Sequence, residues 1–382
     1  MKIVFSKDVL LSNLMPVMGT VSNKNTITSL EGVLIETLGG DTVRFTTYDM
    51  NKGTRTTFKA LEVIEEGKYI INAQRLSQIV KVMADGEITI EVDDKLAVKI
   101  SGESSSFTMY AFNGVEFPAL PELRGERGFS IEGEKLREMI GKVMHSIAEN
   151  ESRPSLCGAY FTINGNTLKV VSCDSFTLSE CSKECDINSL GEVEENVFKF
   201  ILPGHALNEM NKILSDKKEM VKLYLARKHA ILETEGLVFF TRRIDGDYFD
   251  YQRIIPRDQT IFVQVERDRL LSGLERALLI ADEKVQGSGK NYVRLEIRDQ
   301  IMTLTSTSTN GRVYDEMVCQ HQGDDLVIGF NCRYLINNIR AANSEQLLLA
   351  LRSSNQAMII RPAEEKEDET FFYMLLPVRI VE

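Results

Sequence analysis

The sequence predicts an α+β protein made of three tandem copies of one unit, in which two helices pack on antiparallel sheets. Amphipathic helical segments occur in pairs, and each pair is interleaved with short strands that alternate apolar and polar residues. The same element order returns about every 130 residues, which is typical of a repeated structural unit. Turn-forming residues at 118–121 and 255–257 separate the copies, and we therefore expect domains at 1–124, 125–256 and 257–382.

The first helix of each copy carries apolar residues at helical spacing. In the first copy Ser6 fits an N-cap, and Pro16 should kink or shorten the helix that follows. The apolar positions of the three helices are Leu10, Leu14, Val17 and Val21, then Leu136, Met139, Ile140, Val143, Met144 and Ile147, and finally Leu270, Leu271, Leu274, Leu278 and Ala281.

The second helix of each copy follows a short apolar strand and precedes a hairpin. These helices open at 72–76, 203–207 and 331–335, after strands at 68–71, 198–202 and 326–330. The first hairpin has apolar faces at 88–92 and 96–100 around a turn at 93–95, and its counterparts turn near 227–229 and 353–355. The last segment, 371–375, reads as the closing strand of the third copy. Pro377 should take 376–379 out of the ladder.

Composition and charge limit the protein's class. The chain has 382 residues, of which 43% are hydrophobic, with neither a leader-like segment nor an apolar run long enough for a membrane helix. We therefore expect a cytoplasmic protein, with no membrane contact and with its six cysteines reduced. The net charge of −11 argues against a nucleic-acid partner unless the basic residues gather on one surface.

No motif indicates catalysis or a cofactor. The four histidines lie in different elements, and Cys181 and Cys185 lack the second pair of ligands that zinc would need. The segment 287–291 (GSGKN) departs from a phosphate loop at two key positions, so a surface loop explains it better. Asp49 and Asp174 follow apolar strands at equivalent places, which favours a structural turn role. We expect no metal, no cofactor and no enzymatic activity.

Basic residues recur at equivalent places on the predicted helices and on the loops that follow them. If the copies curve around an axis with these helices inward, the basic residues would line a channel and touch phosphates without reading bases. The absence of Trp makes a stacking platform for single strands a weaker alternative. The candidate DNA contacts are Lys24, Arg75, Lys81, Arg137, Lys142, Arg153, Arg269, Lys284 and Lys290.

Several short segments, in order, resemble one known family. They are 1–5 (MKIVF), 116–121 (EFPALP), 250–256 (DYQRIIP), 329–331 (GFN) with Tyr334 and Leu335, and 376–379 (LPVR). None is specific alone, but their order over three repeats is similar to that of the bacterial sliding clamp, the beta subunit of DNA polymerase III. The resemblance covers essentially the whole chain.

This resemblance implies a crescent that dimerises head to tail into a ring around double-stranded DNA, without sequence specificity. The strand at 104–110 would pair with the third domain of the partner, and the matching interface positions are Phe107, Met109, Leu279 and Ile280. The implied protein partners are a second copy of the chain, the DNA polymerase III alpha subunit, the clamp loader, and other polymerases and repair proteins that carry short clamp-binding peptides.

The resemblance also implies a peptide groove between the second and third domains. Its positions here are Leu156, Cys173, Ser175, Thr177, Leu178, Phe249, Arg253, Ile254, Tyr334, Met374, Leu376, Pro377, Val378 and Arg379. The chain departs from the family where Ser175, Phe176 and Thr177 replace a common Gly-His-Arg and Phe249 replaces a proline. Two other hypotheses stay open: a monomeric peptide-binding scaffold with this fold that does not encircle DNA, and a nucleotide- or metal-dependent enzyme.

Overall fold

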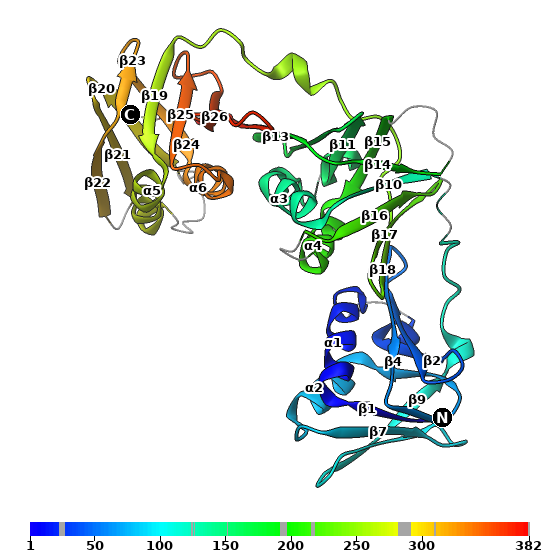
Figure 1. The fold of residues 1–382 in the computed structure, drawn as a ribbon. Helices are drawn as coiled ribbons and strands as arrows, with labels where there is room; N and C mark the ends of the chain where they lie inside the picture. The colour runs from blue at the N-terminus through cyan, green and yellow to red at the C-terminus, as the bar shows by residue number, and fades with distance from the viewer. Residues whose placement is uncertain are drawn as a thin grey trace. The chain divides into compact units, whose positions relative to one another are not determined.

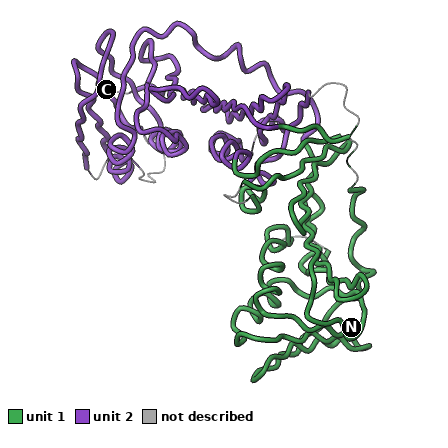
Figure 2. Tube along the Cα trace, in the orientation of Figure 1, with its two compact units in different colours: residues 1–134, 187–194, 208–243 green, residues 135–186, 195–207, 244–382 purple. Residues whose placement is uncertain are grey.

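The structure is a computed structural model that describes residues 1–22, 27–123, 125, 127–150, 152–191, 197–214, 218–281, 292–308 and 311–380. The chain forms two compact units (Figure 2). Unit 1 contains 1–134, 187–194 and 208–243, and unit 2 contains 135–186, 195–207 and 244–382. The central third of the chain contributes to both units, and the helices α3 (Gly133–Val143) and α4 (Gly204–Ile213) cross from one to the other.

Unit 1 is built on one sheet, whose strand order is β14-β10-β16-β17-β18-β4-β3-β2-β6-β9-β8-β7-β1-β5 (Figure 1). Its strands are β1 (Lys2–Ser6), β2 (Gly32–Thr37), β3 (Thr42–Tyr48), β4 (Lys52–Lys59), β5 (Glu62–Glu65), β6 (Lys68–Asn72), β7 (Glu87–Val92), β8 (Ala97–Ser101), β9 (Ser106–Asn113), β10 (Arg127–Glu132), β14 (Asn188–Leu190), β16 (Met220–Leu225), β17 (His229–Thr234) and β18 (Leu237–Arg242). Its helices are α1 (Lys7–Val17) and α2 (Ala73–Val82), with 3-10 turns η1 (Met18–Thr20), η2 (Thr28–Glu31) and η3 (Gly114–Glu116).

Unit 2 has two sheets, ordered β15-β11-β12-β13-β27-β26-β25-β19-β23 and β22-β21-β20-β24. The strands are β11 (Gly158–Asn164), β12 (Thr167–Cys173), β13 (Thr177–Glu184), β15 (Val197–Pro203), β19 (Ile261–Glu266), β20 (Tyr292–Arg298), β21 (Ile301–Ser308), β22 (Gly311–Val318), β23 (Gln320–Gln322), β24 (Leu326–Asn331), β25 (Gln346–Leu351), β26 (Met358–Pro362) and β27 (Glu369–Leu375). Its helices are α5 (Arg267–Ala281) and α6 (Cys332–Ala341), with 3-10 turns η4 (Met144–Ser146), η5 (Pro154–Cys157) and η6 (Tyr251–Ile254).

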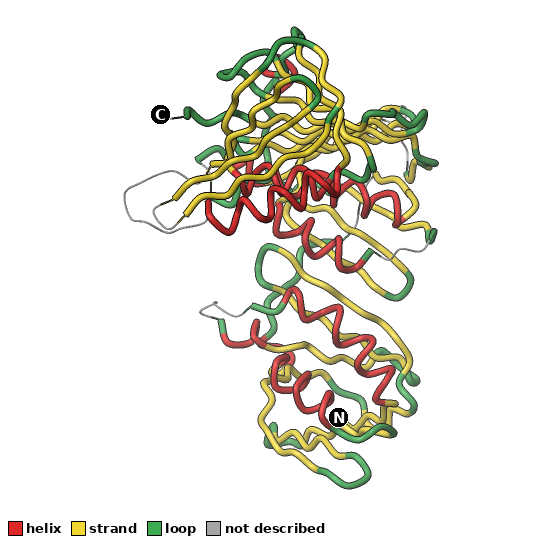
Figure 3. Tube along the Cα trace, turned by 90° about the vertical axis from the view of Figure 1, so that its left-hand side faces the viewer, coloured by secondary structure: helices red, strands yellow, loops and turns green. Residues whose placement is uncertain are grey.

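The repeated element order predicted from the sequence is present. Helices α1 and α2 pack together, as do α5 and α6, and Figure 3 shows the helices lying against the strands. The side chain of Asn72 caps α2 by accepting from the Arg75 N–H, and Asn331 caps α6 in the same way. No helix in the described part of the chain is long and apolar enough to span a membrane.

The expected first helices are too long at their C-terminal ends in two copies. Helix α1 ends at Val17, one residue after Pro16, and α3 ends at Val143. Both continue as a single 3-10 turn, so Val21 and Ile147 lie outside the helices. In the first hairpin Leu96 belongs to the turn, with a positive φ of 63°, and the second strand starts at Ala97.

Two strand pairs join the predicted copies to each other. In unit 1, β18 pairs antiparallel with β4, and Phe239 lies opposite Thr54. In unit 2, β27 pairs antiparallel with β13, and Tyr373 lies opposite Ser179. Neighbouring copies are therefore joined by backbone hydrogen bonds as well as by side-chain packing.

Candidate functional site

The outer face of the β12, β13 and β27 ladder carries an apolar cluster. Leu156, Cys173, Leu178 and Met374 are buried in it, and Phe249 packs against them while only partly buried. Burial raises the pKa of the Cys173 thiol, so the sulfur stays neutral and adds to the apolar floor. These five residues are all predicted groove positions, and the structure brings them together.

A rigid turn between β12 and β13 forms one wall of this cluster. Asp174 Oδ1 accepts hydrogen bonds from the backbone N–H groups of Phe176 (2.9 Å) and Thr177 (2.7 Å). Ser175 has a positive φ of 77°, which a non-glycine residue adopts only when its surroundings hold it there. Asp49 makes the same pair of bonds in the β3–β4 turn, which confirms the structural role predicted for both carboxylates.

A pair of stacked aromatic rings lies at this turn. The rings of Phe176 and Tyr334 lie with centroids 5.6 Å apart and planes at 21°. Phe176 is 55% exposed, so its ring is available to a ligand. It was not among the predicted groove residues, although the unusual 175–177 segment drew attention to this turn.

The terminal segment leaves the sheet as the sequence predicts. β27 ends at Leu375, and the Leu376 N–H then donates to the Phe176 carbonyl (3.0 Å). The Val378 N–H donates to the Gly329 carbonyl (2.8 Å). These two bonds hold the tail between the turn of one predicted copy and a strand of the next.

The remaining groove positions are more dispersed. Arg253 is exposed and its Nε lies 2.7 Å from Asp250 Oδ2, while Ile254 beside it is exposed and apolar. Pro377, Val378 and Arg379 line a separate open cleft of about 1280 Å³ with Tyr292 and Arg294. The predicted set thus covers an apolar cluster and a separate open cleft along the tail.

A buried polar network lies behind the groove wall. His145 Nε2 is 2.6 Å from Asn338 Oδ1 and 3.2 Å from Ser179 Oγ, and Ser146 Oγ links Ser179 to Thr177. Burial lowers the pKa of His145 to about 4, so the ring is neutral at physiological pH. The network couples elements of the second and third predicted copies.

Comparison with known proteins identifies the family. Models of the N-terminal, central and C-terminal domains of the DNA polymerase III beta subunit match residues 1–121, 130–250 and 252–379. The chain belongs to the bacterial beta sliding clamp family. It is 26% identical to the clamp of Bacillus subtilis over 389 residues, covering 99% of this chain and 100% of that one. It is 27% identical to the clamp of Pseudomonas putida over 383 residues, with both chains covered completely.

Solved clamps share the whole fold. A putative DNA polymerase III beta subunit from Eubacterium rectale matches with a TM-score of 0.88 and 27% identity, over 100% of both chains. The beta subunit from Thermotoga maritima matches with a TM-score of 0.88 and 25% identity, again over 100% of both. These comparisons confirm the predicted family and three-domain α+β class.

The predicted clamp interface residues lie on one strand and one helix, and they differ in exposure. Phe107 and Met109 lie on β9, where Phe107 is half-buried and Met109 is buried. Leu279 is 79% exposed near the end of α5, and Ile280 beside it is half-buried. β22 is the edge of its four-stranded sheet and exposes Tyr314 and Val318.

Some of the predicted DNA-contact residues are exposed, and others already pair with protein groups or are partly buried. Arg75 and Lys81 are exposed on α2, and Arg269 on α5 is exposed while pairing with Asp315. Exposed Arg153 donates from Nη2 to Ser175 Oγ (3.0 Å), which places it at the groove wall. Arg137 on α3 is half-buried, and Lys24, Lys284 and Lys290 lie outside the described residues.

Lys142 requires a correction. Its side chain is only 6% exposed, and its ammonium pairs with Glu369, itself 5% exposed, while lying 4.7 Å from the centre of the Phe371 ring. An ammonium enclosed in this way is not accessible to a phosphate, so the prediction that Lys142 contacts DNA is wrong. Lys142 is instead a structural link between α3 and β27.

Proposed function

We propose that this clamp is a non-enzymatic, cytoplasmic processivity factor that closes as a head-to-tail homodimer around double-stranded DNA. Its groove would tether the DNA polymerase III alpha subunit, the clamp loader, and other polymerases and repair proteins through short peptides. Tethering raises the effective concentration of a partner at DNA without requiring tight DNA contacts. We also retain 1–124, 125–256 and 257–382 as the three domains.

The proposed dimer is supported by a pairing between equivalent strands that the chain already makes twice. β18 and β27 each end a three-stranded meander, β16-β17-β18 and β25-β26-β27. Each pairs with the last strand of another meander, β4 of β2-β3-β4 or β13 of β11-β12-β13. The third pair of equivalent strands is β9 and β22, and these two strands do not pair with each other among the described residues.

Both of these strands have open edges. In the part of the chain that the structure describes, β22 pairs only with β21, and β9 uses its second edge only at 111–113, where it meets β6. Open edges that match a junction already made twice favour the same pairing between two chains. Because the two ends are different surfaces, the contact is heterologous, and closure of two chains gives a ring.

The two internal junctions also predict the register of the third. Phe239 on β18 and Tyr373 on β27 lie opposite Leu232 and Ile360, which in turn lie opposite Leu223 and Leu349. Phe107 holds the matching place in β9, because it lies opposite Ile100, which lies opposite Ile90. The partners of Phe239 and Tyr373 across the two junctions, Thr54 and Ser179, each lie opposite a buried hydroxyl residue, Thr47 or Ser172.

The corresponding hydroxyl residue in the third copy identifies the position on β22 that is equivalent to Thr54 and Ser179. Buried Ser306 on β21 lies opposite Val313 on β22. We therefore expect Phe107 of one chain to lie opposite Val313 of the other.

A cysteine pair tests this directly. Directly opposed Cβ atoms lie about 4.5–5.5 Å apart, close to the reach of a disulfide. The variant F107C/V313C should form a covalent dimer under mild oxidation, and when closed around circular DNA it should stay bound in high salt until the circle is cut. F107C/R312C is the matched control, because successive side chains on a strand face opposite sides.

Two results would count against encirclement. One is equal crosslinking in the two cysteine variants, and the other is equal retention on circular and linear DNA. A monomeric mass in sedimentation at low concentration would favour the alternative, a peptide-binding scaffold that does not encircle DNA.

The groove is supported by its apolar floor, its fixed turn and its exposed aromatic ring, which suit capture of a short linear peptide. A fluorescent peptide from the polymerase alpha subunit should bind the wild-type clamp, and L376D should abolish binding by placing a charge at the groove wall. Unchanged affinity in L376D would place the peptide elsewhere.

A further inference from the structure

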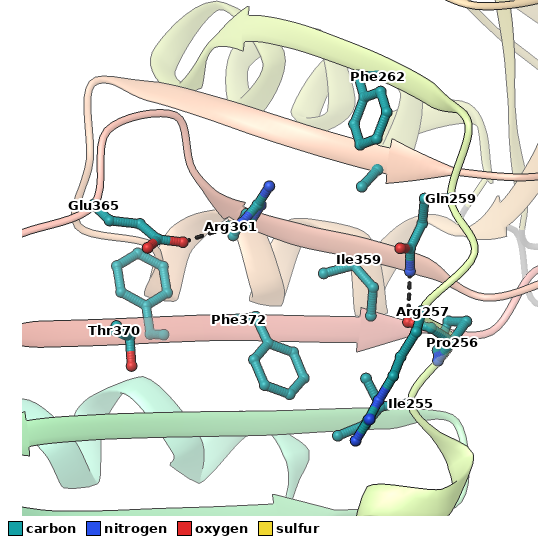
Figure 4. A pocket seen from close by; sticks show the side chains of 12 residues that line it. Ile255, Pro256, Arg257, Gln259, Phe262, Ile359, Arg361, Glu365, Thr370 and Phe372 are labelled. Carbon is teal, nitrogen blue, oxygen red and sulfur yellow. Dashed lines mark hydrogen bonds and ion pairs between the residues drawn. The ribbon is translucent and has the colours of Figure 1, made fainter.

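A pocket of about 310 Å³ lies on the outer face of the sheet in unit 2, beside the predicted groove (Figure 4). Phe262 on β19, Ile359 on β26 and Phe372 on β27 line it, and the segment from Ile255 to Gln259 forms one side. None of these residues is a predicted groove position, although Ile254, which precedes Ile255 in the chain, is one. The volume lies at the small end of the range for ligand pockets, about 300–1,000 Å³, and suits one large side chain.

The apolar residues that line the pocket do not belong to the buried face of the sheet. Side chains alternate along a strand, and Val263, Ile360 and Tyr373 point to the opposite, fully buried face. Phe262 and Phe372 therefore belong to the outer face, where a solvated sheet would carry polar residues. Both remain partly exposed even with the Ile255–Gln259 segment packed beside them.

The pocket is continuous with the groove. Phe372 and Met374 share one face of β27 two residues apart, or about 7 Å along a strand. Both belong to a single apolar cluster that also contains Cys173, Leu178 and Phe262. Ile254 is a predicted groove position and the next residue, Ile255, lines the pocket, so this segment borders both.

A positive charge at the rim of the pocket favours a bound peptide in which an acidic residue adjoins the apolar side chain. Arg257 is exposed at the pocket, and within the described residues it has no carboxylate at ion-pair distance. Across the pocket Arg361 Nη1 lies 3.1 Å from Glu365 Oε1, so that guanidinium is already paired (Figure 4). One unpaired guanidinium beside an apolar cavity matches a carboxylate next to an apolar group.

We propose that this pocket is an accessory subsite for partner peptides, which takes a large apolar or aromatic side chain followed by a carboxylate, in a segment flanking the part held in the groove. This inference rests on the proposed peptide-binding function. It assigns the flanking segment a defined place and makes it a determinant of affinity.

The protein contains no Trp, so a Trp in the peptide can be observed without background. The probes are a Trp-free clamp-binding peptide from the polymerase alpha subunit and two extended forms with Gly-Gly-Trp-Asp at one end or the other. One extended form should bind about tenfold more tightly than the core peptide, with a blue-shifted Trp emission, because its ring leaves water.

Two pocket variants separate the subsite from the groove. T370F changes an exposed residue at the mouth and should remove both the added affinity and the emission shift. R257E should weaken the extended peptide by about fivefold. Both should bind the core peptide like wild type, and R298E, the same charge change at an exposed position on β20, should bind every peptide like wild type.

The outcomes are distinct. If both extended peptides bind like the core peptide, or if T370F keeps the blue shift, the pocket is not the subsite. If wild type does not bind the core peptide at all, the proposed groove fails and the accessory subsite fails with it.

Discussion

The buried Lys142–Glu369 pair gives the sharpest test of how the second and third copies are held together. It links α3 to the first residue of β27, where Glu369 lies opposite Lys183. Lys183 is 3.7 Å from Glu369 and 2.8 Å from Glu138, so Glu369 keeps a second cation if Lys142 is removed. Lys142 has no second carboxylate among the described residues.

The two single variants should therefore differ. E369Q leaves a buried, unpaired ammonium and should cost about 4 kcal/mol of unfolding free energy, while K142M should cost less, about 3 kcal/mol. The double variant K142M/E369L removes both charges and should recover to within about 1 kcal/mol of wild type, because it replaces a desolvated pair by apolar contacts.

Urea unfolding followed by circular dichroism measures these differences. With an m-value of about 2 kcal/mol/M, E369Q should lower the transition midpoint of unit 2 by about 2 M. R298M removes an exposed guanidinium that is 63% accessible and should change stability by less than about 1 kcal/mol. An E369Q protein with the wild-type midpoint, or a double variant no more stable than E369Q, would refute the reasoning.

Three further outcomes are expected. F176A should weaken core-peptide binding about fivefold in a fluorescence titration by removing one ring of the exposed stack, and equal affinity would show that the stack is not part of the groove. The depressed pKa of His145 contributes stability that is complete above pH 6.5, and the free energy of unfolding should fall by roughly 3 kcal/mol from this source as the pH drops to about 4. In urea unfolding at several pH values, H145Q should not show this decrease. Identical pH profiles for H145Q and wild type would contradict the prediction. R75S/K81S should reduce the log–log salt slope of DNA binding by about 1.8 for each chain of the ring, and an unchanged slope would show that neither side chain meets a phosphate.

The sequence alone determined the repeat and most of its elements. Local periodicity was enough for this, because apolar spacing along a helix or strand reports which face is buried. It placed the capped starts of α2 and α6 at Asn72 and Asn331, and it showed that Pro377 ends the closing strand. Helix ends were less predictable: α1 and α3 both tighten into 3-10 turns, a change that the apolar spacing does not encode.

Only the tertiary structure decided what the charged and aromatic side chains do. Lys142 and Arg75 both look like solvated helix cations in sequence, yet one is enclosed against Glu369 and Phe371 while the other is exposed. The Phe176–Tyr334 stack joins residues far apart in the chain. Such contacts depend on which strands of different copies meet, and the β18–β4 and β27–β13 registers arise from long-range packing that no local pattern specifies.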